Sequence, residues 1–84
     1  MKRAITFLTR RGCTLCHDSL PGIEEWASRL GLGVEVIDVD SSPDLSERYG
    51  DRVPVVISSE GEVLLWGRWG RLREARMMLR ARYG

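Results

Sequence analysis

Two cysteines lie in the stretch that decides the fold, FLTRRGCTLCH at residues 7–17. The apolar residues before them predict a β-strand over residues 4–9, followed by a short turn. A helix is expected to begin at Thr14, which places the Cys13 and Cys16 pair at a strand-to-helix turn. A disulfide between cysteines this close closes almost no loop and constrains the unfolded chain little. A chemical role therefore explains the pair better than a structural one.

A helix over residues 14–30 is predicted next, since apolar residues recur there at helical spacing. Pro21 removes one backbone hydrogen bond from that helix, so we expect a kink at this point. Gly31 and Gly33 are expected to end the helix. The next apolar run predicts a strand over residues 34–39, parallel to the first because a helix connects the two.

The second half of the chain alternates turn residues with short apolar runs. Ser42 and Pro43 are typical of the start of a helix, which is expected to stop at Gly50. The remaining predicted elements are strands at residues 55–57 and 63–66, paired as an antiparallel hairpin, and a final helix at residues 71–82. The order β-α-β-α-β-β-α predicts an α/β fold in one domain over residues 1–84, with a four-stranded mixed sheet and helices on both faces.

Composition limits the classes of protein that fit this sequence. The 84 residues are 43% hydrophobic and 30% charged, which is ordinary for one globular domain. The apolar runs are too short for a membrane span, and the run near the N-terminus is too short for a signal peptide. We therefore expect a cytoplasmic monomer that does not contact a membrane.

Charge is distributed unevenly, although the formal net charge is only +1. Residues 1–16 carry four Lys or Arg and no acid, residues 17–62 carry eleven acids against three Arg, and residues 67–84 carry six Arg against one acid. Basic ends of this kind would suit an acidic protein partner. The arginines of the last predicted helix lack the interleaved aromatic residues of a nucleic-acid site, so we expect a solvated helix face there and no nucleic-acid binding.

Cys13 is expected at a position where a helix favours a thiolate. Backbone N–H groups in the first turn of a helix stabilise negative charge, and Arg10 and Arg11 add positive charge nearby. Cysteines in such surroundings have pKa values of roughly 3.5–7.5, so we expect Cys13 to be the nucleophile. Cys16 lies one turn further on and can resolve a mixed disulfide formed at Cys13. His17 is expected to be a polar helix residue.

Other interpretations of the cysteine pair stay open. The two residues could be reduced core cysteines that happen to lie three positions apart. Zinc needs four ligands, and the pair supplies half of them beside His17, so no metal site is expected within one chain. An iron–sulfur cluster shared by two chains needs fewer ligands from each. A non-catalytic binding module would need no reactive thiol. We expect no resident cofactor.

The sequences FLTRRGCTLCH at residues 7–17 and RVPVVI at residues 52–57 resemble the glutaredoxin-like branch of the thioredoxin superfamily. The resemblance extends over nearly the whole chain. The resemblance implies a thiol–disulfide oxidoreductase that reduces protein or glutathione-mixed disulfides through its cysteine pair. It also implies a cis peptide bond before Pro54, which would lie against the cysteines. That bond would leave the backbone of Val53 free to pair with an extended substrate.

The same resemblance assigns substrate contacts. Arg10 stands where glutaredoxins often place a lysine that meets a glutathione carboxylate. Pro21 matches the helix-kinking proline of thioredoxins, whereas Phe7 replaces their buried acid, which favours the glutaredoxin side. Trp66 is expected to pack in the core. The residues expected to contact substrate are Arg10, Thr14, Leu15, Arg52, Val53, Pro54, Arg68 and Trp69.

Two departures from the glutaredoxin pattern leave the electron donor open. The residues between the cysteines are Thr14 and Leu15, where glutaredoxins commonly have Pro-Tyr. The sequence WGRWGR at residues 66–71 lacks the acid that would hold the glutathione ammonium group, although Arg68 could meet a carboxylate. Glutathione is therefore one candidate reductant, and a thioredoxin-reductase-type flavoenzyme or a dedicated protein partner is the other.

Overall fold

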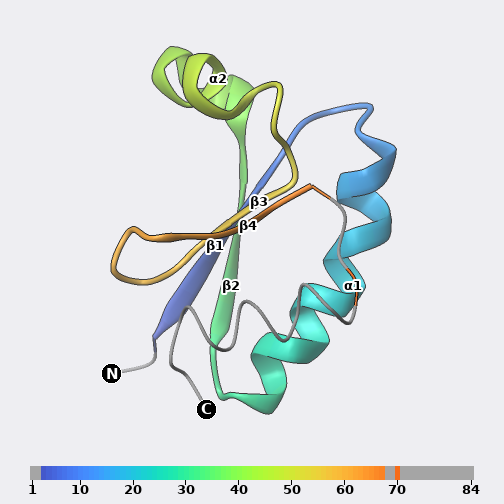
Figure 1. Ribbon diagram of the computed structural model, residues 1–84, viewed down its shortest axis with the longest axis vertical. Helices are drawn as coiled ribbons and strands as arrows, with labels where there is room; N and C mark the ends of the chain where they lie inside the picture. Colours follow the sequence, from blue (N-terminus) through green and yellow to red (C-terminus); the bar gives the residue numbers. More distant parts are fainter. Residues whose placement is uncertain (1–2, 68–69, 71–84) are drawn as a thin grey trace.

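The computed structural model describes residues 3–67 and 70 of the chain (Figure 1). The elements within these residues are, in order, β1 (Ala4–Thr9), α1 (Thr14–Arg29), β2 (Gly33–Asp38), the 3₁₀ turn η1 (Val39–Ser41), α2 (Pro43–Tyr49), β3 (Val55–Ile57) and β4 (Val63–Trp66). The predicted strands and the first two predicted helices are confirmed, each to within one residue. The helix predicted over residues 71–82 lies outside the described residues. Neither described helix has the length and apolar character needed to span a bilayer.

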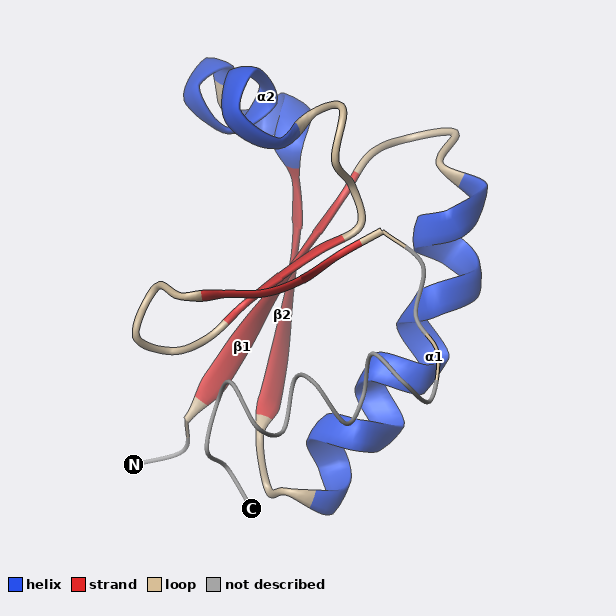
Figure 2. Ribbon diagram, viewed as in Figure 1, coloured by secondary structure: helices blue, strands red, loops and turns tan. Residues whose placement is uncertain are grey.

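The strands form a mixed sheet in the order β2-β1-β3-β4 (Figure 2). β1 pairs with β2 in parallel and with β3 antiparallel, and β3 and β4 form the predicted antiparallel hairpin. Because β1 and β2 are parallel, their carboxyl ends meet at the same end of the sheet, where Thr9 pairs with Asp38. The turns that leave β1 and β2 therefore start side by side.

The first helix ends in a Schellman motif. The N–H of Leu32 donates to the carbonyl of Ala27 at 2.8 Å, and the N–H of Gly31 donates to the carbonyl of Ser28 at 3.1 Å. Gly31 has a φ of +71°, which a residue without a Cβ adopts at low cost. The role predicted for Gly33 is corrected, because Gly33 begins β2. The helix runs through Pro21 without interruption.

The second helix begins as its sequence predicts. The hydroxyl oxygen of Ser42 accepts the N–H of Leu45 at 3.5 Å, and Pro43 occupies the first turn. Gly50 is the C-terminal cap, where its N–H donates to the carbonyl of Ser46 at 2.9 Å. This local cap chemistry fixes both ends of a helix of only seven residues.

Helices pack on both faces of the sheet, as predicted. The α1 side holds the larger apolar core, formed by Ile5, Phe7, Cys16, Ile23, Trp26, Ala27, Val56, Leu64 and Leu65. On the α2 side, the fully buried residues are Leu8, Val39 and Val55, with Leu45 and Tyr49 of α2 packed against them. Figure 2 shows α1 along one side of the sheet and α2 near the carboxyl ends of β1 and β2. The cysteine pair belongs to the more heavily packed side.

The expectation that Trp66 packs in the core is wrong, because its exposed fraction is 49%. A β-bulge shifts the pairing of β3 with β4, so that Leu64 and Leu65 both join the α1-side core. The next residue, Trp66, pairs with Val55, whose side chain belongs to the opposite face. The guanidinium carbon of Arg52 lies 4.8 Å from the centroid of the Trp66 ring, which is a cation–π contact.

Candidate active site

The two cysteines are joined by a disulfide at the start of α1, with their Cα atoms 5.3 Å apart. Cys13 is the N-cap of the helix and is half-buried, whereas Cys16 is 2% exposed. The N–H of Cys16 donates to the Cys13 sulfur at 3.1 Å. An incoming thiol or thiolate therefore has access to the first sulfur, while the second is covered by the core.

The turn before Cys13 is built for a sharp change of direction. The N–H of Cys13 donates to the carbonyl of Arg10 at 3.1 Å, which closes the turn. Gly12 has a φ of +80°, in the left-handed region that favours glycine. The N–H groups in the first turn of a helix have no carbonyl partner within the helix. The side chain of the cap residue can accept a hydrogen bond from one of them. In this helix a sulfur atom takes that role.

A pocket of about 490 Å³ opens beside the disulfide, on the side of the edge strand β2. Its apolar walls come from Phe7, Leu20 and Val36, and both cysteines line it. Val36 is 49% exposed, although it pairs with the buried Phe7. The pocket is large enough and apolar enough to receive a side chain next to the reacting sulfur.

The peptide bond between Val53 and Pro54 is cis, which confirms that expectation from the family resemblance. Pro54 is buried, and its carbonyl accepts the N–H of Gly67 at 2.8 Å, so it holds the chain that leaves β4. Val53 and Cys13 both pack against the α1-side core. Pairing of the Val53 backbone with a substrate stays a prediction.

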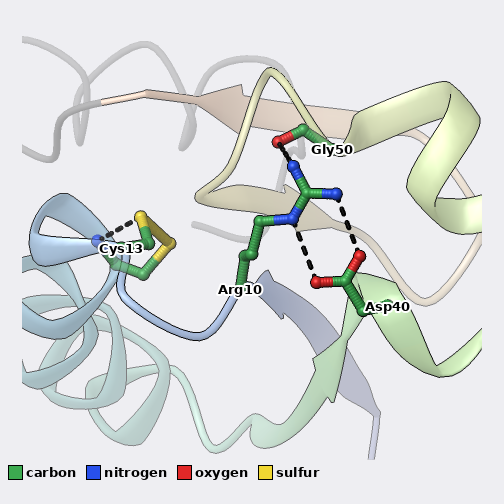
Figure 3. The surroundings of a disulfide bond; sticks show 5 residues. Arg10, Cys13, Asp40 and Gly50 are labelled. Carbon is green, nitrogen blue, oxygen red and sulfur yellow. Dashed lines mark hydrogen bonds and ion pairs between the residues drawn. A yellow bond between two sulfur atoms is a disulfide. The ribbon is translucent and has the colours of Figure 1, made fainter.

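Arg10 makes a double contact with Asp40. Its Nε donates to Oδ2 at 3.1 Å and its Nη2 donates to Oδ1 at 2.9 Å. The hydrogen bond and the nearby charge of Arg10 lower the pKa of Asp40 below its ordinary value of 3.8, and the same hydrogen bond raises the pKa of Arg10. Figure 3 shows the guanidinium turned away from the disulfide, towards Asp40 and Gly50. The positive charge that Arg10 was expected to add near Cys13 is therefore paired with a carboxylate.

The other predicted contact residues occupy different parts of the surface. Thr14 and Leu15 are exposed on the first turn of α1, and Leu15 has an exposed fraction of 44%. Arg52 is exposed and lies over the Trp66 ring. Arg68 and Trp69 lie outside the described residues. His17 is exposed and lines the pocket beside the disulfide.

Sequence reasoning missed the partners of Arg10, which are Asp40, Ser46 and Gly50. A signal for Asp40 was present in the predicted topology. Arg10 follows one parallel strand directly, Asp38 ends the next one, and Asp40 lies in the turn after it. Since parallel strands finish at the same end of a sheet, opposite charges at those two points are expected to meet. No comparable signal marked Ser46 or Gly50.

Three kinds of known protein are similar to this chain. The family described as Glutaredoxin-like domain (DUF836) matches residues 4–76. Uncharacterized proteins of Mycobacterium bovis and Mycobacterium tuberculosis are 36% identical over 67 residues, which is 74% of this chain and 69% of each relative. The solution structure of protein Ne2328 from Nitrosomonas europaea has a TM-score of 0.68 at 28% identity, and the match covers 79% of each chain.

Thioredoxin 1 from Thermosipho africanus also has this fold. Its TM-score is 0.64, and the match covers 93% of this chain and 92% of the thioredoxin. The sequences are 24% identical, so this likeness shows the fold alone. The family match, in contrast, begins at β1 and continues beyond the last described strand. The chain therefore belongs to the glutaredoxin-like domain family and has a thioredoxin-like fold.

Proposed function

We propose that this protein is a thiol–disulfide oxidoreductase that reduces disulfides in protein or glutathione-mixed substrates. One observation carries the proposal: the accessible sulfur of Cys13 receives a backbone hydrogen bond at the helix N-terminus, and the buried sulfur of Cys16 is within bonding reach of it. A structural cysteine needs neither the accessibility nor the hydrogen bond. A nucleophile needs access to the substrate, and the hydrogen bond favours its ionised form, whereas a resolving cysteine needs only to lie within reach of the nucleophile.

The reaction begins with the reduced protein. The Cys13 thiolate attacks one sulfur of the substrate disulfide, forms a mixed disulfide and expels the other substrate sulfur as a thiolate, which takes a proton from water. The Cys16 thiol then loses its proton and attacks the Cys13 sulfur. The mixed disulfide breaks and the second substrate thiol leaves. Two electrons have passed to the substrate, and the protein holds the Cys13–Cys16 disulfide.

The first turn of α1 supports the first step. A thiolate at Cys13 would receive the N–H of Cys16, which already points at that sulfur. The partial positive charge of a helix N-terminus adds to this bond, and both favour the ionised form of the thiol. Since the guanidinium of Arg10 is paired with Asp40, the backbone is the source of stabilisation that the geometry supports best.

Substrate is proposed to bind across the two walls of this site. On one side, an extended chain would pair with the backbone of Val53, next to the cis peptide bond. On the other side, the pocket beside Val36 would receive an apolar side chain. Thr14, Leu15 and Arg52 are exposed and available for contact, and Arg68 and Trp69 stay predicted contacts. Electrons would return from glutathione or from a flavoenzyme reductase.

A paired set of cysteine variants tests this function. Cys13→Ser is expected to abolish reduction of a peptide disulfide, whereas Cys16→Ser is expected to accumulate a mixed disulfide at Cys13 that mass spectrometry detects. Ser58 is a buried polar residue away from the cysteines, and Ser58→Ala therefore serves as the control for general damage to the fold. A sustained reductase rate in Cys13→Ser would sink the mechanism. Running the assay with glutathione and glutathione reductase, and separately with thioredoxin reductase, identifies the donor.

A further inference from the structure

Four hydrogen bonds from one guanidinium connect the turn before Cys13 to a distant part of the chain. Besides its two bonds to Asp40, Arg10 donates from Nη1 to the carbonyl of Gly50 at 3.0 Å (Figure 3). Its Nη2 also donates to the hydroxyl of Ser46 at 3.1 Å. Ser46 in turn donates to Asp40 at 3.3 Å. We name these four residues the Arg10 clasp.

The glycine of the clasp makes room for the guanidinium. A Cβ at Gly50 would lie 3.0 Å from Nη2 and 3.1 Å from Nη1 of Arg10, and 2.5 Å from the carbonyl oxygen of Ser46. Gly50 has a φ of −52° and a ψ of −38°, which any L-residue adopts easily. A side chain at Gly50 would therefore meet the Ser46 carbonyl first and the Arg10 guanidinium next, so the close approach of both groups explains the glycine, and the backbone conformation does not require it.

The clasp joins the two sides of the proposed substrate site. On one side, the carbonyl of Arg10 accepts the N–H of Cys13 at 3.1 Å, so this residue ends the turn that holds the nucleophile. On the other side, Gly50 opens the segment that leads through Arg52 to the cis bond after Val53. A side chain that grips this segment fixes the nucleophile turn relative to the backbone that would pair with substrate.

We propose that Arg10 is a positioning residue, which sets Cys13 against the Val53 backbone and leaves substrate carboxylates to other groups. This inference rests on the proposed function and narrows its substrates to disulfides held by backbone pairing. Four of the five N–H donors of the guanidinium are already used, so a glutathione carboxylate could form a two-point contact with Arg10 only by displacing one of these partners. Arg10 thereby differs from the role that the family resemblance assigned to it.

Loss of the clasp should affect substrate reduction and simple thiol chemistry differently. Small errors in the position of a reacting group reduce the rate strongly, by up to about a hundredfold for a displacement of about 1 Å. The hydrogen bond from Cys16 to the Cys13 sulfur lies within one turn of α1 and does not involve the clasp. Alkylation of Cys13 by a small reagent, which needs no pairing with Val53, should therefore be preserved.

The test uses two variants of the clasp in the full chain: Arg10→Gln and Asp40→Asn. Each is expected to lower kcat/KM for a peptide disulfide about tenfold. The rate constant for alkylation by iodoacetamide should stay within about twofold of the wild-type value, and the pH at the midpoint of its pH profile should not change. Asp44→Asn is the matched control, because Asp44 forms a long ion pair with Arg48 on the exposed side of α2. It should leave both measurements unchanged.

The response of Asp40→Asn decides between positioning and direct substrate binding. If Arg10 bound a substrate carboxylate, releasing it from Asp40 would maintain or raise activity towards glutathione-mixed disulfides, while Arg10→Gln would lower it. That result would overturn the inference. An inactive wild-type protein would instead contradict the proposed function. In that case, exchange of the Cys13 amide proton still tests the clasp: about tenfold faster exchange in Asp40→Asn than in Asp44→Asn supports it, and equal rates refute it.

Discussion

The two faces of the sheet are held together by different interactions. Among residues 3–67, nine buried residues on the α1 side form a continuous apolar core that includes Cys16. Within the same part of the chain, three residues are buried on the α2 side, and α2 itself buries none completely. The polar contacts from Arg10 to Asp40, Ser46 and Gly50 fasten that second helix to the active-site turn.

This difference suggests a division of labour between the faces. Burial of apolar surface fixes α1, whose first turn carries both sulfurs, because close packing restricts movement in all directions. Hydrogen bonds donated by one guanidinium fix the segment before Val53. Because these bonds are directional, they can hold the segment in one position although little apolar surface is buried there. The first face supports the stability of the fold, and the second supports the alignment of the proposed site. The following variants test this comparison.

The largest expected effect is on the α1 side. Trp26 is 1% exposed, so Trp26→Ala should lower the free energy of unfolding by about 3–5 kcal/mol, through lost burial and the cavity that remains. Leu45→Ala on the half-buried face of α2 should cost about 1–2 kcal/mol. Urea denaturation measures both values. Equal losses would contradict the difference between the two faces.

A smaller effect is expected where α2 begins. The Ser42 hydroxyl accepts an N–H of the first turn, so Ser42→Ala should destabilise the protein by about 1 kcal/mol. Ser59 is exposed in the turn between β3 and β4 and provides a control, since Ser59→Ala removes no helix cap. Denaturant unfolding of the two variants should separate them. Identical midpoints would show that the cap contributes nothing to this face.

Substitution of the surface residue Trp66 should change the stability of the protein little, although its side chain is large. Its ring is half exposed and contacts Arg52, so Trp66→Ala should change the free energy of unfolding by about 1 kcal/mol or less. Leu65→Ala, one position earlier in the α1-side core, should cost about 2–5 kcal/mol. Thermal or urea unfolding of the two variants measures both losses. A larger loss for Trp66→Ala than for Leu65→Ala would mean that the tryptophan ring lies inside the core.

The Arg10 clasp also predicts a pH dependence with a definite sign. Asp40 has a pKa below its ordinary value of 3.8, so its charged form is favoured in the folded protein. Its contribution to stability is complete above that ordinary value and disappears as the pH falls through the lower pKa of the folded state. The difference in unfolding free energy between wild type and Asp40→Asn should therefore vanish in acid. A difference that grows below pH 3.8 would contradict this.

Local signals in the sequence were enough for most of the elements. The cap at Ser42, the turn at Gly31 and the alternation of apolar runs depend on neighbours a few residues away, and the structure has each of them. The cysteine pair was placed at a strand-to-helix turn for the same reason. The error at Gly33 was a boundary error, because a glycine after a helix cap can equally begin the next strand.

Trp66 shows where local reasoning fails. The run from Val63 to Trp66 is uniformly apolar, and its sequence contains no sign of the bulge that turns the last residue outwards. Bulges arise from the pairing of two strands, here β3 and β4, so the face that each residue occupies depends on its partner.

By itself, the sequence determined the order of the described elements, the starts of α1 and α2 and the position of the sulfurs, because hydrogen bonds and apolar periods within a few residues decide them. The predicted topology indicates an acidic partner for Arg10, but tertiary structure alone decided that this partner is Asp40, thirty positions away, and that Gly50 leaves space for the guanidinium. Those contacts exist only after two parallel strands have brought their ends together. The sequence contains many acidic residues that could pair with Arg10, and the topology of the sheet places Asp40 within hydrogen-bonding distance.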